Sequence, residues 1–290
     1  MATVRQSTVG SWGKCSYKIK LGRQYGYRTS IVRVLGTAVH KAHEIYYLER
    51  KEGRQISTSN VFVDGAIAEL DYEVGKSEKM DWQFQGQTKY KDELILDREL
   101  SIKWITELVH MYHDQKWYYP LDWEILGVEE TFTMPLPDSP HQAHGTMDLM
   151  MKDPRGNIVC ADHKTSKEFV TKSKYTQKSS IQASYYTWAT SVILGVPLEG
   201  IQFYFDVLSW APRKAGRGKT IDPTARFERF NETRTPEQVH ASLKHANIVG
   251  DLMDKDAYVP NTDGWWCSKN FCDYFNECEY GKTYAISSLN

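Results

Sequence analysis

The sequence lacks the long apolar segments of a membrane protein. No run approaches the roughly 18–20 residues of a membrane-spanning helix, and the stretch MATVRQSTVGSWGKCSYKIK has no apolar signal segment. Internal repeats and low-complexity tracts are also missing. The stretch GRGKT at 216–220 matches only part of the GxxxxGK[ST] phosphate loop, because it lacks the leading glycine at the required spacing. We therefore expect a cytoplasmic protein without membrane contact or a nucleotide-binding loop of that type.

A large net charge is also missing. The value of −1 at pH 7 argues against a generally basic, histone-like binder. Basic residues nevertheless concentrate in two places: Lys164–Lys178 holds five lysines against one glutamate, and Arg213–Lys219 holds four basic residues. Either stretch can be a solvated loop, and the first could also follow a phosphate backbone.

The residues that are present predict a globular α/β protein. The chain has 290 residues, 41% of them hydrophobic and 25% charged, which is enough to bury a sizeable core. Apolar spacing predicts helices at 30–50, 61–76, 90–115, 178–194 and 236–254, and strands at 124–134, 144–152, 157–164, 201–210 and 226–230. We expect one domain over 1–290, with a helical part at 1–120, an α/β core at 121–260 and a C-terminal segment at 261–290.

The stretch GTMDLMMKDPRGNIVCADHKTS predicts a β-hairpin with an acidic residue on each strand. DPRGN fits a three-residue loop, with proline at the second position of a type I turn and Gly156 in the left-handed conformation. The numbers of paired residues then sum to 310, so Asp148 and Asp162 face each other with Cβ atoms about 4.5–5.5 Å apart. Lys164 points to the same face as Asp162. A register shifted by one residue would separate the two carboxylates.

Two carboxylates held this close repel each other unless a cation lies between them. Oxygen ligands with octahedral preference suit Mg²⁺ or Mn²⁺. Beside such an ion, Lys164 could stabilise the negative charge of a phosphoryl transition state or position the attacking water. The plain alternative is a surface hairpin with an Asp–Lys ion pair, worth at most about 1 kcal/mol.

Three further motifs accompany this hairpin, which itself contains GTMDLMMK with Asp148 and ADHKTS with Asp162 and Lys164. In chain order they are GTAVHKAHE with His40 and Glu44, GVEETF with Glu129, and QASYY with Gln182 and Tyr186. With these motifs the sequence resembles the RecB-like branch of the PD-(D/E)XK nuclease superfamily. The resemblance implies a restriction-endonuclease-like mixed sheet flanked by helices, with an N-terminal helical addition.

The resemblance also implies roles for these residues. One Mg²⁺ or Mn²⁺ would be held by His40, Asp148, Asp162 and the backbone carbonyl of His163. Lys164 would steady the nucleophile or the pentavalent charge. From the following helix, Gln182 and Tyr186 would position the phosphate and the nucleophile.

Five cysteines in a chain without a signal argue against a disulfide framework. Cys160 lies in the middle of a predicted strand and is typical of a small buried hydrophobe. The other four resemble the arrangement that staples the two chain ends of this branch around a [4Fe–4S] cluster: Cys15, Cys267, Cys272 and Cys278. Four residues separate the first C-terminal pair, where relatives commonly have two. Zinc and unligated thiols remain alternatives.

The function that this resemblance implies is a stand-alone DNA exonuclease of a bacterium, an archaeon or a phage-infected cell. Its partner would be DNA, as a single strand or a duplex end, and its process recombination, repair or spacer acquisition. Protein partners from recombination or CRISPR systems and a homo-oligomeric ring also fit the resemblance. The alternatives are an endonuclease of the same superfamily, an inactive nuclease scaffold that binds DNA, and an unrelated metal-dependent phosphodiesterase. The sequence leaves cleavage polarity open.

Overall fold

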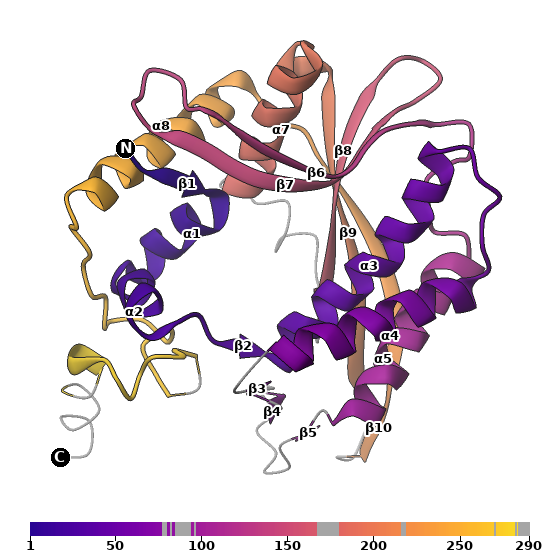
Figure 1. The fold of residues 1–290 in the computed structure, drawn as a ribbon, viewed down its shortest axis with the longest axis horizontal. Helices are drawn as coiled ribbons and strands as arrows, with labels where there is room; N and C mark the ends of the chain where they lie inside the picture. The colour runs from indigo at the N-terminus through magenta and orange to yellow at the C-terminus, as the bar shows by residue number, and fades with distance from the viewer. Residues whose placement is uncertain are drawn as a thin grey trace. The chain divides into compact units, whose positions relative to one another are not determined.

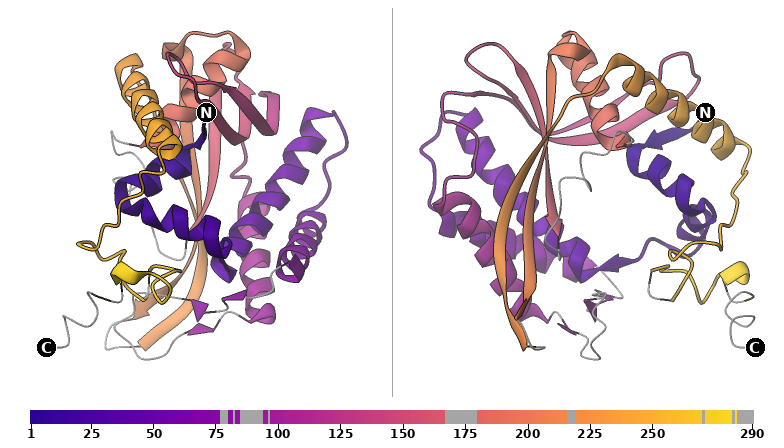
Figure 2. Two further views of the ribbon diagram at one scale, coloured as in Figure 1. Left: turned by 60° about the vertical axis from the view of Figure 1, so that its left-hand side comes forward. Right: turned by 180° about the vertical axis from the view of Figure 1, so that it is seen from behind.

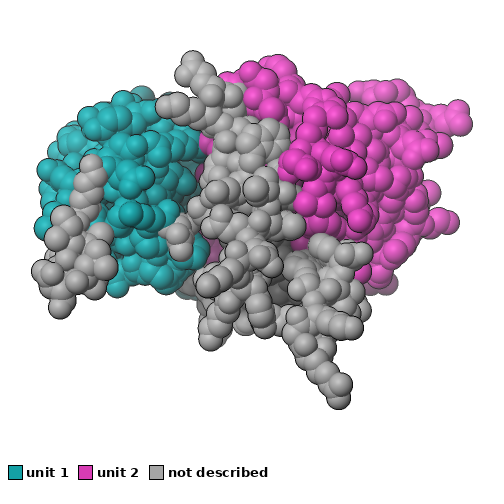
Figure 3. Space-filling model, turned by 90° about the horizontal axis from the view of Figure 1, so that it is seen from below, with its two compact units in different colours: residues 1–28, 131–145, 237–290 teal, residues 29–130, 146–236 magenta. Residues whose placement is uncertain are grey.

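The computed structural model describes residues 1–76, 80–81, 83–84, 94–95, 97–166, 180–215, 219–269, 271–281 and 283. Most of the lysine-rich stretch after Lys164 and residues 216–218 of the second basic stretch lie outside the described residues. The chain forms two compact units, coloured separately in Figure 3: residues 1–28, 131–145 and 237–290 form unit 1, and residues 29–130 and 146–236 form unit 2. The expectation of one domain remains a prediction.

Unit 2 contains most of the helices and strands. Its helices are α3 (Ile31–Lys51), α4 (Ser59–Lys76), α5 (Arg98–Asp114), α7 (Ile181–Leu194) and the 3₁₀ helix η1 (Leu198–Gly200). Its strands are β2 (Thr29–Ser30), β3 (Met80–Asp81), β4 (Gln83–Phe84), β5 (Leu94–Ile95), β8 (Ile158–Ser166), β9 (Ile201–Ala215) and β10 (Lys219–Glu232). Two strands continue from one unit into the other: β6 (Glu124–Pro135) and β7 (Gln142–Lys152).

The main sheet is mixed, as the resemblance implied. β7 and β8 pair antiparallel, β8 and β9 parallel, and β9 and β10 antiparallel, while β6 pairs with the other edge of β7. The parallel step requires a crossover connection, which α7 supplies between β8 and β9. The α/β fold class predicted from the sequence is confirmed.

The helices of unit 2 cover the two faces of this sheet. Figures 1 and 2 show α3, α4 and α5 together beside β8, β9 and β10. Their buried side chains share one apolar core with Leu149, Val159, Leu208 and Trp210 of the sheet. The side chain of Phe203 on β9 points to the opposite face of the sheet, where it contacts Tyr186 of α7. Alternation along the strands therefore gives each helical layer its own apolar face.

Most predicted boundaries agree with the structure within a few residues. The helix predicted at 90–115 is wrong at its start, because residues 94–95 form β5 and α5 begins only at Arg98. The side chain of Asp97 accepts a hydrogen bond of 2.8 Å from the backbone N–H of Leu100, which caps the helix there. The strand predicted at 226–230 is longer, since β10 pairs with β9 over most of its length.

Unit 1 brings together the two ends of the chain. It contains β1 (Thr3–Arg5), α1 (Gln6–Cys15), α2 (Tyr17–Tyr25) and α8 (Pro236–Asp254). β1 pairs in parallel with the start of β7. The side chain of Arg28 bonds to the carbonyl of Asp273 and to the carboxylate of Glu277. The predicted N-terminal helical addition is therefore divided, with α1 and α2 in one unit and α3 to α5 in the other.

Candidate functional site

The β7–β8 hairpin has the register expected from its loop. The paired residues run from Lys152 with Ile158 to Leu149 with Ala161, and each pair sums to 310. Gly156 adopts a φ of 89°, in the left-handed region that the loop requires. The next pair in this register would be Asp148 and Asp162. The register prediction is confirmed, and it brings both acidic residues to the same end of the hairpin.

Asp148 is fixed by the neighbouring strand. The backbone N–H of His163 donates a hydrogen bond of 2.7 Å to Oδ2 of Asp148. The same oxygen lies 3.4 Å from Nδ1 of His40 on α3. The side chain of Asp148 is 10% exposed and that of His40 is 27% exposed, so solvent reaches the pair from the side of the imidazole.

The close approach of α3 to β8 depends on a glycine. A Cβ atom at Gly36 would lie 3.0 Å from Oγ1 of Thr165, which is closer than ordinary side-chain contacts. Gly36 stands one turn before His40 on the same helix. The glycine of the GTAVH motif therefore lets the helix carry His40 up to the strand that bears the acidic motif.

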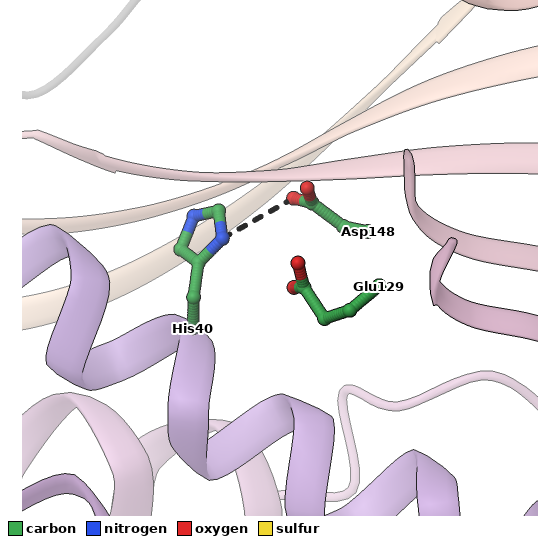
Figure 4. Close-up of side chains that lie close together, drawn as sticks. All are labelled: His40, Glu129 and Asp148. Atoms are coloured by element: carbon green, nitrogen blue, oxygen red, sulfur yellow. Dashed lines mark ion pairs between the residues drawn. The ribbon is translucent and has the colours of Figure 1, made fainter. Parts of the chain in front are cut away.

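Glu129 joins His40 and Asp148 in one group, shown in Figure 4. One donor atom from each of the three side chains lies within 4.8 Å of the others, and the described residues contain no other such group of three. Glu129 adopts a φ of 49°, which a side-chain-bearing residue seldom takes within a strand. The sequence placed Glu129 near the site only by resemblance, and this backbone conformation could not be predicted from it.

Two polar groups hold the carboxylate of Asp162. Nζ of Lys164 lies 2.6 Å from Oδ2 of Asp162. The side-chain amide of Gln182 on α7 donates a hydrogen bond of 2.6 Å to Oδ1. Tyr186 is buried one turn further along α7 and hydrogen-bonds to Gln182. Asp162 does not belong to the group of three in Figure 4, so the structure divides the predicted metal ligands into two neighbouring sets.

Burial raises the pKa of all three acidic side chains, and repulsion between carboxylates adds to the shift for Glu129 and Asp162. Burial is the largest cause for Glu129, whose pKa rises to about 8, with further contributions from Asp148 and Glu44. Burial also raises the pKa of Asp148 to about 6, although the ammonium of Lys164 opposes the shift. The pKa of Asp162 rises to about 6 for the same reason, and the Asp148 charge adds to it. Carboxylates under this strain bind a cation readily, because it removes the repulsion.

The pKa of His40 moves the opposite way. Burial and the ammonium of Lys164 together lower it to about 4. The charge of Asp162 and a hydrogen bond to the backbone of His163 partly offset these effects. The imidazole is therefore neutral near pH 7, which is the form that binds a metal ion.

A cavity of about 680 Å³ opens beside this group. Its lining comes from α3, with contributions from α4, β6 and β8, and includes His40, Glu129 and Lys164. The cavity gives a substrate access to the imidazole of His40, the carboxylate of Glu129 and the ammonium of Lys164.

The side chain of His163, the middle residue of the ADHKTS motif, lies in a buried aromatic cluster. Its ring stacks on His43 with ring centroids 4.5 Å apart. Neither ring nitrogen of His43 or His113 has a hydrogen-bond partner among the described residues. Burial lowers the pKa of His43 and His163, and that of His113 to about 3. These imidazoles are neutral packing groups.

Sequence reasoning missed a buried ion pair beneath the site. Asp206 is fully buried and accepts hydrogen bonds from Arg229 at 2.6 and 2.8 Å, and from the hydroxyl of Tyr119 at 3.3 Å. Its Oδ2 lies 3.9 Å from Nε2 of His163. A lone aspartate within the apolar run IQFYFDVLSW was the available signal, since such a charge requires a buried partner.

In unit 1 the four cysteines of the predicted cluster lie near one another. Burial is the largest cause of the raised pKa of Cys267, and charges on Cys272, Cys15 and Cys278 raise it further. Cys272 and Cys278 pack with Leu21 and Tyr274 in a small apolar core. All five cysteines are free thiols, so no disulfide occupies this region.

The sheet, the hairpin and the group of acidic residues define a nuclease-like α/β protein. The chain matches the model of the PD-(D/E)XK nuclease superfamily over residues 6–279, and it therefore belongs to this superfamily. This membership supports a nuclease function, the hydrolysis of phosphodiester bonds in DNA.

A solved structure shares the fold at low sequence identity. A crystal structure of a presumed exonuclease from Eubacterium rectale is 12% identical, with a TM-score of 0.51, and the match covers 91% of this chain and 86% of that one. A crystal structure of the protein SSO0001 is 14% identical, and the match covers 63% of this chain and 77% of that one. Its TM-score of 0.35 is too low to show a common fold. No curated protein matches the sequence. None of the described helices is long and apolar enough to cross a membrane.

Proposed function

We propose that this protein is a metal-dependent DNA exonuclease of the RecB-like branch, acting in DNA recombination, repair or processing. The observation that carries the proposal is the group of His40, Glu129 and Asp148 beside Asp162 and Lys164. The exonuclease activity is further supported by the name of the Eubacterium rectale protein and by the resemblance of the motifs.

The donor set suits a hard divalent cation. Two carboxylates and a neutral imidazole are ligands that Mg²⁺ and Mn²⁺ accept. The raised pKa values of Glu129 and Asp148 show that the charged carboxylates are unfavourable in this site without a cation. A bound cation would stabilise the charged forms. His40, Glu129 and Asp148 would hold the ion, and an oxygen of Asp162 is the nearest further candidate. The bound ion would lower the pKa of a water ligand, so that hydroxide forms near neutral pH.

The remaining polar groups prepare the site for a phosphate. Lys164 lines the cavity and carries an ammonium next to Asp162, where it can donate to a non-bridging phosphate oxygen as negative charge develops. Gln182 holds the opposite oxygen of Asp162 and so fixes the direction of that carboxylate. Tyr186 hydrogen-bonds to Gln182 and therefore positions it, with no direct contact to the acidic residues required.

The nuclease assay tests the proposal directly. Purified protein is incubated with end-labelled oligonucleotides and with plasmid in Mg²⁺, in Mn²⁺ and in a chelator, next to the Asp162→Ala variant. We expect metal-dependent loss of terminal nucleotides that the variant lacks. Cleavage of closed plasmid would replace the exonuclease by an endonuclease. DNA binding without cleavage in any metal would identify an inactive scaffold.

We also propose that Cys15, Cys267, Cys272 and Cys278 bind a [4Fe–4S] cluster. Their sulfur atoms are not among the groups of three donors within 4.8 Å found in the described residues. A zinc ion would need thiolates about 3.8 Å apart, because each Zn–S bond is about 2.3 Å long. A four-iron cluster binds each thiolate to a different iron and holds them further apart. This wider spacing argues against a zinc site and is compatible with the four-iron cluster.

Metal analysis of protein purified without oxygen tests this second proposal. We expect about four irons per chain, a brown colour, and loss of both in the Cys272→Ser variant. The Cys160→Ala variant is the matched control, because Cys160 is buried in the sheet of unit 2 and should leave the iron content unchanged. Colourless protein with one bound zinc would overturn the assignment.

A further inference from the structure

We propose that Arg33, which lines the same cavity two turns before His40 on α3, binds a backbone phosphate of the DNA strand whose scissile phosphate lies at His40. The inference rests on the proposed nuclease function. It adds a substrate-positioning subsite that uses none of the groups assigned to the reaction.

The subsite follows from one face of α3. Arg33, Thr37, His40 and Glu44 stand at positions i, i+4, i+7 and i+11 of the helix, and all four line the cavity. His40 lies seven positions after Arg33, which is a rise of about 10.5 Å along the helix axis at 1.5 Å per residue. A strand lying along this face would therefore meet Arg33 at a phosphate other than the one being cleaved.

The lining of the cavity carries charge of both signs. It includes Glu44, which forms an ion pair with Lys41, and also Glu129 and Lys164. The lining residues nearest to Arg33 along the chain, which are Ser30, Val32, Gly36 and Thr37, have no carboxylate. Glu69 of α4 is the remaining carboxylate of the lining. The first turn of α3 also contains no acidic residue, so its positive dipole adds to the Arg33 charge.

The polar groups of the lining match a phosphate in kind as well as in charge. An arginine side chain presents several N–H donors in a planar fork, which binds two phosphate oxygens at once. The hydroxyl group of Thr165 also lines the cavity and can donate to a third oxygen, whereas that of Thr37 donates to the backbone carbonyl of Arg33. Phosphate contacts of this kind position a strand without reading its sequence.

Binding measurements at several salt concentrations test the subsite. Fluorescence anisotropy of a labelled single-stranded oligonucleotide is recorded in chelator for the wild type, Arg33→Ala, Arg33→Lys and Arg155→Ala. Arg155 is the matched control, because it is exposed in the turn of the hairpin, outside the cavity lining. We expect Arg33→Ala to weaken binding for all sequences and to reduce the slope of log affinity against log salt by about 0.7. Arg33→Lys should keep the slope, and Arg155→Ala should match the wild type.

Cleavage kinetics separate positioning from a structural effect. Arg33→Ala should raise KM while kcat at saturating DNA stays within about two-fold, which is the pattern of lost uniform binding. An oligonucleotide with one neutral methylphosphonate near the cleavage site should lose affinity for the wild type and none further for Arg33→Ala. Additive losses at every methylphosphonate position would overturn the subsite.

The outcomes also distinguish this inference from the proposed function. A wild-type protein that neither binds nor cleaves DNA would remove both. A wild-type protein that cleaves DNA, with an Arg33→Ala variant of unchanged KM and salt slope, would remove the subsite alone.

Discussion

The backbone N–H of His163 donates to Oδ2 of Asp148 over 2.7 Å, across the two strands of the β7–β8 hairpin. This bond links the middle residue of the ADHKTS motif to the acidic residue of the preceding strand. It directs the Asp148 carboxylate towards His40, whose Nδ1 lies 3.4 Å from the same oxygen. The side chains of β8 alternate, so that Asp162 and Lys164 lie on one side of the strand and His163 lies in the core. One strand therefore carries polar residues of the site and a residue that packs beneath them.

Replacing Lys164 should abolish cleavage while leaving the fold intact. Lys164→Ala removes the ammonium that opposes the raised pKa of Asp162 and that would stabilise the transition state. We expect kcat to fall by at least about 100-fold, with circular dichroism unchanged. Lys152→Ala is the control, because Lys152 forms an exposed ion pair with Glu124 on the same hairpin. Undiminished metal-dependent activity of Lys164→Ala would reject the catalytic assignment.

Metal affinity should rise with pH between 6 and 8. The pKa of Asp148 is raised to about 6 and that of Glu129 to about 8, so protons occupy these carboxylates in the metal-free protein and must leave when the ion binds. Each released proton makes the affinity rise by up to about tenfold per pH unit below the corresponding pKa. Calorimetry with Mn²⁺ in buffers of different ionisation enthalpy measures the proton release directly.

Glu129→Gln separates the two steps of this pH dependence. The variant should lose the rise between pH 6 and 8 and keep the rise below pH 6 that belongs to Asp148. Glu130→Gln is the matched control, because the neighbouring carboxylate pairs with Lys51 and does not belong to the metal group. The same affinity at pH 6 and pH 8 in the wild type would contradict the placement of the metal on these residues.

A side chain at Gly36 should disturb the site through the helix. Gly36→Val introduces carbon atoms against Oγ1 of Thr165, which would push α3 from β8 and move His40. We expect a loss of about 1–3 kcal/mol in the free energy of unfolding, as for other overpacked sites, together with weaker metal binding. Urea unfolding and Mn²⁺ titration measure the two effects.

Two further variants test the cause of this effect. Thr165→Ala in the Gly36→Val background should restore part of both losses. Gly75→Ala should change stability in the opposite direction, by up to about 1 kcal/mol, because no atom lies within 4 Å of its added Cβ. A Gly36→Val variant as stable as the wild type would show that the contact with Thr165 does not set the helix position.

Breaking the buried ion pair should cost far more than breaking an exposed one. Arg229→Met leaves the fully buried carboxylate of Asp206 without its cation, which typically costs about 3–5 kcal/mol. Arg98→Met removes the partner of Asp71 on the surface and should cost less than about 1 kcal/mol. Urea unfolding at pH 7 compares the two, and equal costs would contradict the buried pairing.

The Arg229→Met variant should also show a stronger pH dependence of stability than the wild type, with a known sign. Burial raises the pKa of Asp206, and Arg229 opposes this shift most strongly. Without Arg229 the folded state holds a proton that the unfolded state releases above about pH 4. Stability of the variant should therefore fall as pH rises from about 4 towards the raised pKa. Asp206→Asn in the same background should abolish this decline.

The sequence by itself predicted the parts of this protein that depend on neighbours along the chain. The hairpin register follows from the DPRGN loop, because loop length and the left-handed glycine determine which residues pair. Helical periodicity located α3 and α8 to within one residue. The order of the motifs indicated the nuclease superfamily, which the family match confirms. The roles of the individual site residues stay predictions.

Only the tertiary structure decided which of these residues meet. It placed Glu129 with His40 and Asp148 and directed Asp162 towards Lys164 and Gln182. It also paired Asp206 with Arg229 and turned Arg33 into the cavity. These contacts depend on the packing of α3 and α7 against the sheet, and packing joins residues far apart in the chain whose spacing no local pattern records.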